Sequence, residues 1–262
     1  MENEFKKELA KGMFISAYSN YIKRKGAKEL LDFLEEIGFF EAPASTKYHG
    51  AYPGGLAEHS VNVFKRLADM ATSEERMADK KQSAYTMDTI AVVALLHDVC
   101  KADAYKTEKK EQKQPDGSLQ EVEVYGYTNN LPLGHGEKSI IQIMRFMQLS
   151  EEEMLAIRWH MGAFDYSTKG GSYDMNYAFN KSRLAAMLHI ADMTATYLDE
   201  GNKNNMSEQL EESEWELMPG PGGWGIGFFK CKNCGHKDGE EKEICPNCKA
   251  KMKKIEWGTA TE

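Results

Sequence analysis

The sequence predicts a mostly α-helical protein that carries an inserted β hairpin and ends in a small cysteine-rich β module. Apolar residues recur at three- and four-residue spacings through most of residues 1–200, which is typical of amphipathic helices. Residues 104–131 break that rhythm, with the turn signal Pro115-Asp116-Gly117 beside a β-type run. After residue 230, four of the five cysteines stand in two Cys-x-x-Cys pairs.

Two helices are expected before residue 40. In the first, over 3–24, Phe5, Leu9 and Met13 recur at spacings near four and predict an apolar face. The second has leucines at helical spacing, and Gly38 is a typical C-terminal stop for it.

A turn-rich segment then leads to the middle of the chain. Residues 42–55 contain two prolines and end in Gly54-Gly55, after which apolar spacing predicts a third helix. Residues 88–100 are almost continuously apolar. Periodicity leaves a buried strand open there, but the length and the alanines favour a buried helix.

Helices resume after the hairpin, first over about 138–147. Ser150 and Glu153 then have the spacing of a capping box, which predicts the start of the next helix. Residues 162–180 are rich in Gly, Tyr and Ser and are expected to form a loop, before a last long helix over about 181–198.

Composition limits the class of protein. The chain has 262 residues, 41% of them apolar, and a formal net charge of −8. An acidic body argues against an extended duplex-binding surface, which needs a basic stripe. It does not exclude a phosphate-bearing substrate, because bound metal ions reverse the local charge. The longest apolar runs are far shorter than a membrane span, and the acidic N-terminus is unlike a signal peptide, so a cytoplasmic protein is expected.

Six histidines and aspartates fall on the expected helices or at their ends. They are His59, His97, Asp98, His135, His160 and Asp192. Helical bundles collect metal ligands from facing helices in this way. Imidazole and carboxylate groups bind Mn, Fe, Co, Ni or Zn, and one carboxylate can bridge two ions about 3.5–4 Å apart that hold a hydroxide between them. Taken singly, His49, His189 and His236 are interpreted as structural or surface residues.

The order His59…His97-Asp98…Asp192 resembles the signature of the HD-domain metal-dependent phosphohydrolases. Gly134-His135 and Trp159-His160, with the residues before them, are similar to the branch with dinuclear sites. Gly54-Gly55-Leu56-Ala57-Glu58-His59 is similar to the opening of YhaM-like 3′-to-5′ exoribonucleases. The resemblance covers about residues 45–200 and implies an HD-domain helical bundle.

The resemblance also implies a role for each matching residue. His59, His97, Asp98 and Asp192 would hold one divalent metal, and Asp98, His135 and His160 a second, with Asp98 bridging. Lys101 would contact the phosphate, and Glu58 would support a ligand or carry a proton. Many dinuclear members have a second histidine where this chain has Met161, and a thioether is a poor ligand for hard ions. We therefore expect fewer protein ligands, more water or partial occupancy at the second position.

The cysteine pairs predict one structural zinc ion. Cys231, Cys234, Cys245 and Cys248 would complete a tetrahedral site with no open position, and the pattern resembles a zinc ribbon. The expected organisation is a helical domain over 1–200, an acidic and Gly-Pro-rich linker over 201–223, and the ribbon over 224–262. The ribbon is either a folding module or a contact for protein or nucleic acid. Cys100 follows an apolar helix and is expected in the core.

These features predict an enzyme that hydrolyses a phosphoester with a metal-activated water. A nucleotide and a short single-stranded nucleic-acid end are both expected as substrate classes. The same ligands accept Mn, Fe, Co, Ni, Zn or Mg. Two alternatives stay open: a non-catalytic metal-binding module that recruits a partner, and a di-iron oxygenase of the HD type.

Overall fold

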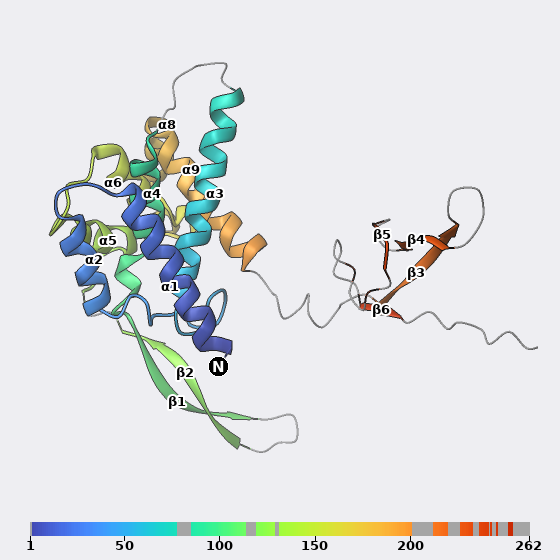
Figure 1. The fold of residues 1–262 in the computed structure, drawn as a ribbon. Helices are drawn as coiled ribbons and strands as arrows, with labels where there is room; N and C mark the ends of the chain where they lie inside the picture. Colours follow the sequence, from blue (N-terminus) through green and yellow to red (C-terminus); the bar gives the residue numbers. More distant parts are fainter. Residues whose placement is uncertain are drawn as a thin grey trace, which may run out of the picture. The chain divides into compact units, whose positions relative to one another are not determined.

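The computed structural model describes residues 2–77, 85–113, 119–128, 131–200, 212–219, 226–232, 236–240, 242, 245 and 251–253. The chain divides into two compact units, Met1–Gly201 and Asn202–Glu262. The first is mostly helical and carries a hairpin, and the second contains a small sheet (Figure 1). A mostly helical protein with small sheets was predicted, and this is confirmed.

The helices of the first unit follow the expected order. They are α1 (Glu2–Tyr21), α2 (Ala27–Glu36), α3 (Gly55–Met77), α4 (Met87–Leu96), α5 (His135–Met144), α6 (Glu151–Trp159), α7 (Tyr166–Lys169), α8 (Asp174–Lys181) and α9 (Arg183–Thr194). Short 3₁₀ turns, η1 (Val99–Lys101) and η2 (Gly162–Phe164), follow α4 and α6, and a π-helical turn, η3 (Ala195–Asp199), continues α9. In the described part of the chain, no helix combines the length and apolar character needed to cross a membrane.

Helix α4 lies at the centre of this unit. Every residue from Ile90 to Leu96 is buried, and α1, α3 and α6 pack around the helix. The apolar segment is therefore a buried helix, as its length and alanines predicted. Full burial of each leucine or valine side chain here contributes about 1.5–3 kcal/mol, so α4 is a rigid support for the residues at its end.

The apolar face predicted for the first helix is wrong. Phe5, Leu9 and Met13 are exposed, and the ridge that packs inward includes Phe14 and Tyr18 instead. Both sets have helical spacing, so periodicity alone could not choose between them. Burial was decided by the partners of the Phe14 ring, which come from the segment after α2.

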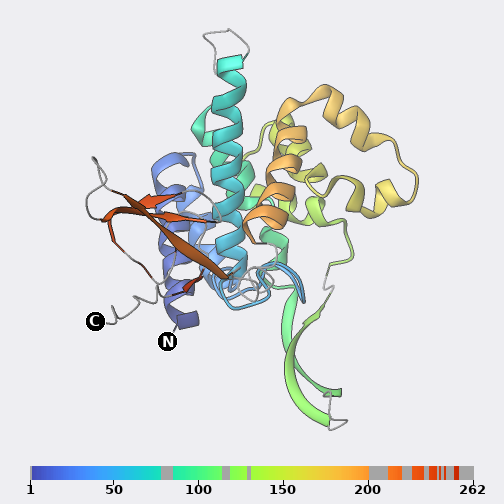
Figure 2. The same cartoon turned by 90° about the vertical axis from the view of Figure 1, so that its right-hand side faces the viewer.

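Strands β1 (Tyr105–Lys113) and β2 (Leu119–Tyr127) form the predicted hairpin. They pair antiparallel, with Tyr105 opposite Tyr127 at the base and Lys113 opposite Leu119 toward the tip. The hairpin extends away from the helical body in both views (Figures 1 and 2). The turn predicted at 115–117 lies outside the described residues.

The predicted loop over 162–180 contains two short helices, α7 and α8. Asp165 caps α7, because its Oδ1 accepts a hydrogen bond from the Ser167 N–H at 2.8 Å. Gly170 and Gly171 then separate the helices. Turn-forming composition concealed these helices, since the same residues also serve as helix caps.

The predicted capping box at the start of α6 is confirmed. Ser150 Oγ accepts from the Glu153 N–H at 3.2 Å, and Glu153 Oε2 accepts from the Ser150 N–H at 2.8 Å. The Glu153 carboxylate is also paired with Arg24, which in turn contacts Asp88 at 2.7 Å. These contacts connect the N-termini of α4 and α6 to the end of α1.

The second unit has one four-stranded sheet in the order β5-β4-β3-β6. Its strands are β3 (Glu212–Pro219), β4 (Ile226–Cys231), β5 (Lys237–Asp238) and β6 (Lys251–Lys253). Strand β4 is antiparallel to β3 and β5, and β6 is parallel to β3. The small core that they cover consists of Trp215, Phe229, Cys231, Cys245 and Met252.

Strand β3 corrects the expected linker over 201–223. Within it, Ser213 and Trp215 are buried, whereas Glu214 and Glu216 are exposed. Two of the acidic residues that suggested a linker, Glu214 and Glu216, lie on the solvent face of a strand with period-two alternation. Net acidity therefore concealed an ordinary half-buried strand.

Candidate metal centre

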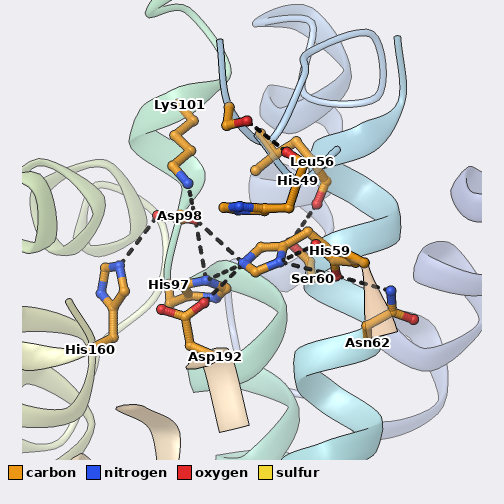
Figure 3. Close-up of polar contacts among 12 residues, drawn as sticks. His49, Leu56, His59, Ser60, Asn62, His97, Asp98, Lys101, His160 and Asp192 are labelled. Atoms are coloured by element: carbon orange, nitrogen blue, oxygen red, sulfur yellow. Dashed lines mark hydrogen bonds and ion pairs between the residues drawn. The ribbon is translucent and has the colours of Figure 1, made fainter. Parts of the chain in front are cut away.

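The six candidate ligands come together in the helical unit. Figure 3 shows His59, His97, Asp98, His160 and Asp192. His59 lies on α3, His97 at the end of α4 and Asp98 in the turn before η1. His135 begins α5, His160 ends α6 and Asp192 lies on α9. Within these six residues, three sets have ligand atoms within 4.8 Å of one another: His59, His97 and Asp98; His97, His160 and Asp192; and Asp98, His135 and His160. A fourth set in the described residues joins His59 to His49 and Glu200.

The two oxygens of Asp98 face different histidines. Oδ1 lies 2.6 Å from His135 Nε2 and 3.3 Å from His160 Nε2. Oδ2 lies 3.3 Å from His97 Nε2 and 3.8 Å from His59 Nε2. One buried carboxylate thus stands between two groups of imidazole nitrogens, as a bridging ligand would.

Asp192 completes the group on the α9 side. Its Oδ1 lies 3.2 Å from His59 Nε2, which is itself 3.3 Å from His97 Nε2. The side chains of both histidines are at most 1% exposed, and that of Asp192 is 14% exposed. The two histidines are therefore enclosed by protein, whereas Asp192 and His135, the latter 22% exposed, keep partial access to solvent.

Two histidines at helix ends are oriented by the helices themselves. His97 Nδ1 donates to the Ala94 carbonyl at 2.8 Å, and His160 Nδ1 donates to the Ile157 carbonyl at 2.7 Å. A carbonyl can only accept, so Nδ1 carries the proton and Nε2 presents its lone pair to the site. This is the orientation that metal-ligating histidines have.

Charged neighbours in the site outweigh the effect of burial on the pKa values of its carboxylates and of His59. Burial would raise the pKa of Asp98, but Lys101, His97 and His135 hold it well below its ordinary value. Burial would lower the pKa of His59, but Glu200 and Asp192 outweigh it and raise the pKa to about 10. The pKa of Asp192 is lowered in spite of burial, chiefly by His59. A buried carboxylate that stays ionised in this way is typical of functional sites.

Lys101, for which the resemblance implies a phosphate contact, lies beside Asp98. Its Nζ is 2.7 Å from Asp98 Oδ2, and its side chain is 11% exposed. Burial disfavours the charged ammonium, but Asp98 and Tyr105 outweigh that effect and raise the pKa of Lys101. The site therefore keeps a fixed positive charge beside its central carboxylate.

Glu58, the other predicted catalytic residue, has a different environment. It precedes His59 on α3, and its Oε2 accepts a hydrogen bond from Tyr52 OH at 2.7 Å. It is not a member of the candidate ligand sets. The structure thus places Glu58 next to a candidate ligand in sequence and in a hydrogen bond with Tyr52.

A close contact between the backbones of Gly50 and Gly55 fixes the residue at which α3 begins. A Cβ atom on Gly55 would overlap the carbonyl oxygen of Gly50, and Gly54 has φ +82°. The Gly50 carbonyl also accepts from the Ala44 N–H at 2.9 Å. Only glycine allows this contact, which sets the first turn of α3 and therefore the position of His59.

Three further residues surround His59 and were not predicted as site residues. Glu200 Oε2 lies 3.0 Å from His59 Nδ1, and Asn62 donates to Glu200 Oε1 at 3.0 Å. His49, interpreted from sequence as structural or surface, packs its ring 5.0 Å from that of His59. No local sequence pattern pointed to Glu200, which lies in an acidic segment.

His189 supports the backbone at the end of α6. Its Nδ1 donates to the His160 carbonyl at 2.6 Å, and its ring stacks on Phe179 with centroids 5.6 Å apart. It is absent from the candidate ligand sets among the described residues. Its interpretation as a structural or surface residue stays a prediction.

Cys100 is buried, as predicted. Its Sγ lies 3.4 Å from His135 Nδ1, and burial raises the pKa of the thiol to about 12. The thiol therefore stays protonated at neutral pH and packs against a candidate ligand.

Two of the four cysteines predicted to bind zinc are described. Cys231, at the end of β4, and Cys245 are both buried in the small core of the second unit. Cys234 and Cys248 lie outside the described residues, so the four-cysteine site stays a prediction.

Comparison with curated proteins gives a match to a phosphodiesterase. The chain is similar to a dihydroneopterin 2′,3′-cyclic phosphate phosphodiesterase of Methanocaldococcus jannaschii, with 39% identity over 69 residues. The match covers 26% of this chain and 26% of that protein. No family model matches the chain, and no solved structure matches it significantly.

Proposed function

We propose that the chain is a metal-dependent phosphohydrolase whose helical unit is an HD-domain bundle. It would cleave a phosphoester of a nucleotide or of a single-stranded nucleic-acid end. The observation that carries the proposal is Asp98, whose two oxygens face separate groups of histidine nitrogens. A partial similarity to a phosphodiesterase supports the same class of reaction.

The donor set fits divalent transition metals. Neutral imidazoles and carboxylates suit Mn, Fe, Co, Ni and Zn. Among the described buried polar atoms, His160 Nε2 has no hydrogen-bond partner, although it points toward Asp98. A lone pair held in that position costs free energy unless a cation or donor compensates it.

Two positions follow from this geometry. His59, His97, Asp98 and Asp192 would hold one ion. Asp98, His135 and His160 would hold a second, and Met161 after His160 leaves that position with fewer protein ligands. Metal ions in such sites lower the pKa of a bound water and neutralise the charge of the phosphate that it attacks.

The protein's own side chains would supply orientation and charge. Lys101 would stabilise negative charge that develops on the phosphate, since its ammonium is fixed beside Asp98. Asp98 stays ionised at neutral pH because Lys101 and the histidines lower its pKa. Burial of the site excludes bulk water, which strengthens each of these interactions.

Two features bear on the substrate. The similar protein acts on a 2′,3′-cyclic phosphate, which makes a small cyclic phosphodiester a further candidate beside nucleotides. Four aromatic side chains after His160 are exposed, namely Phe164, Tyr166, Tyr173 and Tyr177, whereas Phe179 packs on His189. Exposed rings of this kind can stack a base, so we propose that they contact the base of the substrate.

For the second unit, we propose a structural zinc ion held by Cys231, Cys234, Cys245 and Cys248. The burial of Cys231 and Cys245 in a common core supports this. Such an ion has no open coordination position and would stabilise the fold of this unit. A contact with protein or nucleic acid through its lysines is a further proposal for the same unit.

The test is metal reconstitution of the purified full chain. Metal-depleted protein is refilled with Mn, Fe, Co, Ni, Zn or Mg and assayed with bis-p-nitrophenyl phosphate, nucleotides, short single strands and 2′,3′-cyclic phosphates. Hydrolysis that returns with a metal and is lost in Asp98→Ala supports the proposal. Full hydrolysis by folded Asp98→Ala would overturn it.

The same experiment separates the alternatives. A metal-loaded, folded chain that hydrolyses none of these substrates would favour a non-catalytic metal-binding module. Oxygen consumption by the iron-loaded chain, without hydrolysis, would favour the di-iron oxygenase.

A further inference from the structure

Glu200 forms a contact with His59 from the end of the last helix. Both of its carboxylate oxygens lie near His59 Nδ1, at 3.0 and 3.2 Å, and its side chain is only 3% exposed. Asn62 donates to Oε1 at 3.0 Å and holds the carboxylate in place. The opposite ring nitrogen of His59 faces Asp98 and Asp192.

The backbone departs from α-helical geometry to make this contact. Residues eight apart in an α-helix are separated by about 12 Å along its axis, yet Asp192 and Glu200 both reach the same imidazole. Between them the chain forms the π-helical turn η3, in which the Glu200 N–H donates to the Ala195 carbonyl five residues earlier, at 3.0 Å. Single π-helical turns occur frequently at functional sites.

His59 needs an acceptor that its own helix does not supply. His97 and His160 stand at helix ends, and each donates its Nδ1 proton to a backbone carbonyl three residues earlier. His59 lies within α3, where backbone carbonyls are engaged in the helical hydrogen bonds. A side chain from another element must therefore accept its proton, and Glu200 is the group in contact.

We propose that Glu200 is the positioning residue of the metal site, and this inference rests on the proposed function of that site. Glu200 accepts the Nδ1 proton of His59, which fixes the ring orientation and directs Nε2 toward Asp98 and Asp192. A carboxylate in this position also increases the basicity of the ligating nitrogen. Glu200 acts through His59 and does not itself contact substrate.

Asp199 offers a matched control from the same turn. Its carboxylate pairs with Arg66, so it also joins η3 to α3, but through a contact away from His59. Removal of Asp199 therefore weakens the attachment of η3 without removing the acceptor of the His59 proton.

The experiment is Mn²⁺ binding by the full-length, metal-depleted chain, measured from the electron paramagnetic resonance signal of free Mn²⁺. Mn²⁺ prefers nitrogen and oxygen ligands to thiolates, so it reports on the helical unit and not on the cysteines. The proteins compared are wild type, Glu200→Ala, Glu200→Gln and Asp199→Ala, with circular dichroism to show that each is folded.

We expect Glu200→Ala to weaken Mn²⁺ binding by about 10–100-fold, the usual effect of removing such a partner. Glu200→Gln keeps an acceptor oxygen but loses the charge, so its loss of Mn²⁺ affinity is smaller. Asp199→Ala binds Mn²⁺ as wild type does.

Unchanged Mn²⁺ binding in both Glu200 variants would overturn the inference, as would an equal loss of affinity in Asp199→Ala. If Glu200→Ala does not fold, the test rests on Glu200→Gln. Mn²⁺ affinity equal to that of wild type in Glu200→Gln then overturns the inference. Absence of Mn²⁺ binding by wild type would instead overturn the proposed metal site itself.

Discussion

The ammonium group of Lys101 lies 2.7 Å from Oδ2 of Asp98, which stands three positions earlier in the chain. Both side chains are largely enclosed by protein. The 3₁₀ turn η1 that follows α4 produces this arrangement, because residues three apart eclipse one another in such a turn. One short turn therefore fixes both the central carboxylate and a positive charge beside it.

Lys101→Ala is expected to lower the catalytic rate constant by about 10²–10³-fold, the usual effect of removing one group that stabilises charge in the transition state. Metal affinity should not fall, because Lys101 competes with the metal for Asp98 and is not itself a ligand. Steady-state hydrolysis and Mn²⁺ titration of the same preparations measure the two effects. A variant with full activity, or one whose only defect is lost metal, would contradict this role.

Gly162→Ala is expected to destabilise the helical unit and displace His189. Gly162 has φ +53°, and a Cβ atom there would overlap the His189 ring. Gly171→Ala is the matched control, since Gly171 has φ +94° but open space around its Cβ position. The unfavourable backbone conformation should cost about 1–2 kcal/mol in either variant.

The difference between the two glycine variants isolates the ring contact. We expect Gly162→Ala to show the larger loss in chemical denaturation and, because His189 holds the His160 carbonyl, weaker metal binding as well. Equal losses of stability with unchanged metal binding would show that His189 does not support His160.

The sequence pointed to the histidines and aspartates that the structure brings together, but not to the residues that contact them from other elements. His97 and His160 could be recognised because candidate ligand types stood at the ends of apolar helices. Glu200 could not, because it lies in an acidic segment, 199–216, that resembles a solvated linker. Its contact depends on the π-helical geometry of η3, which follows from packing against α3 and leaves no pattern in the local sequence.

Some elements of the fold were also predicted from the sequence, and others were not. The buried helix α4 and the hairpin have strong local signals, and both were predicted. The exposed ridge of Phe5, Leu9 and Met13 was taken for the buried one because helical periodicity does not say which face meets a partner. Strand β3 was missed because its glutamates raised the net charge of a segment whose alternate residues are buried.

The Arg24–Glu153 pair should make the helical unit less stable in acid. Burial would raise the pKa of Glu153, but Arg24 and the Ser150 N–H lower it below its ordinary value. The stabilisation from this ion pair is thus complete above the pKa of Glu153 in the unfolded chain, about 4.3. It is lost as pH falls through the lower pKa of Glu153 in the folded protein. We expect the free energy of unfolding to decrease over that acid range.

Glu153→Gln tests this dependence. It removes one charge of a largely buried pair, and since Arg24 remains 25% exposed the cost should be about 2–3 kcal/mol at neutral pH. Its stability should also change less between pH 5 and 3 than that of wild type (about one unit on either side of the unfolded pKa). Denaturation curves at several pH values measure both quantities, and parallel pH profiles for the two proteins would contradict the assignment.

Removal of the proposed zinc ion should unfold the second unit and leave the first intact. Cys231 and Cys245 pack against Trp215, whose side chain is buried and whose Nε1 donates to the Lys242 carbonyl at 2.9 Å. Four thiolates without zinc would lose a binding free energy of about 10–16 kcal/mol, which in such modules is folding free energy. The core around Trp215 should then open to solvent.

Cys231→Ser and Cys245→Ser are expected to reduce bound zinc by one ion per chain, as measured by elemental analysis of the purified full chain. Cys100→Ser is the control, because Cys100 packs against His135 in the helical unit and should leave that ion in place. A red shift of tryptophan fluorescence that disappears in Trp215→Phe would assign the opening to the small core. Wild-type zinc content in both Cys231→Ser and Cys245→Ser would show that these buried thiols are packing residues, and the stability of the sheet would then have to come from Trp215, Phe229 and Met252 alone.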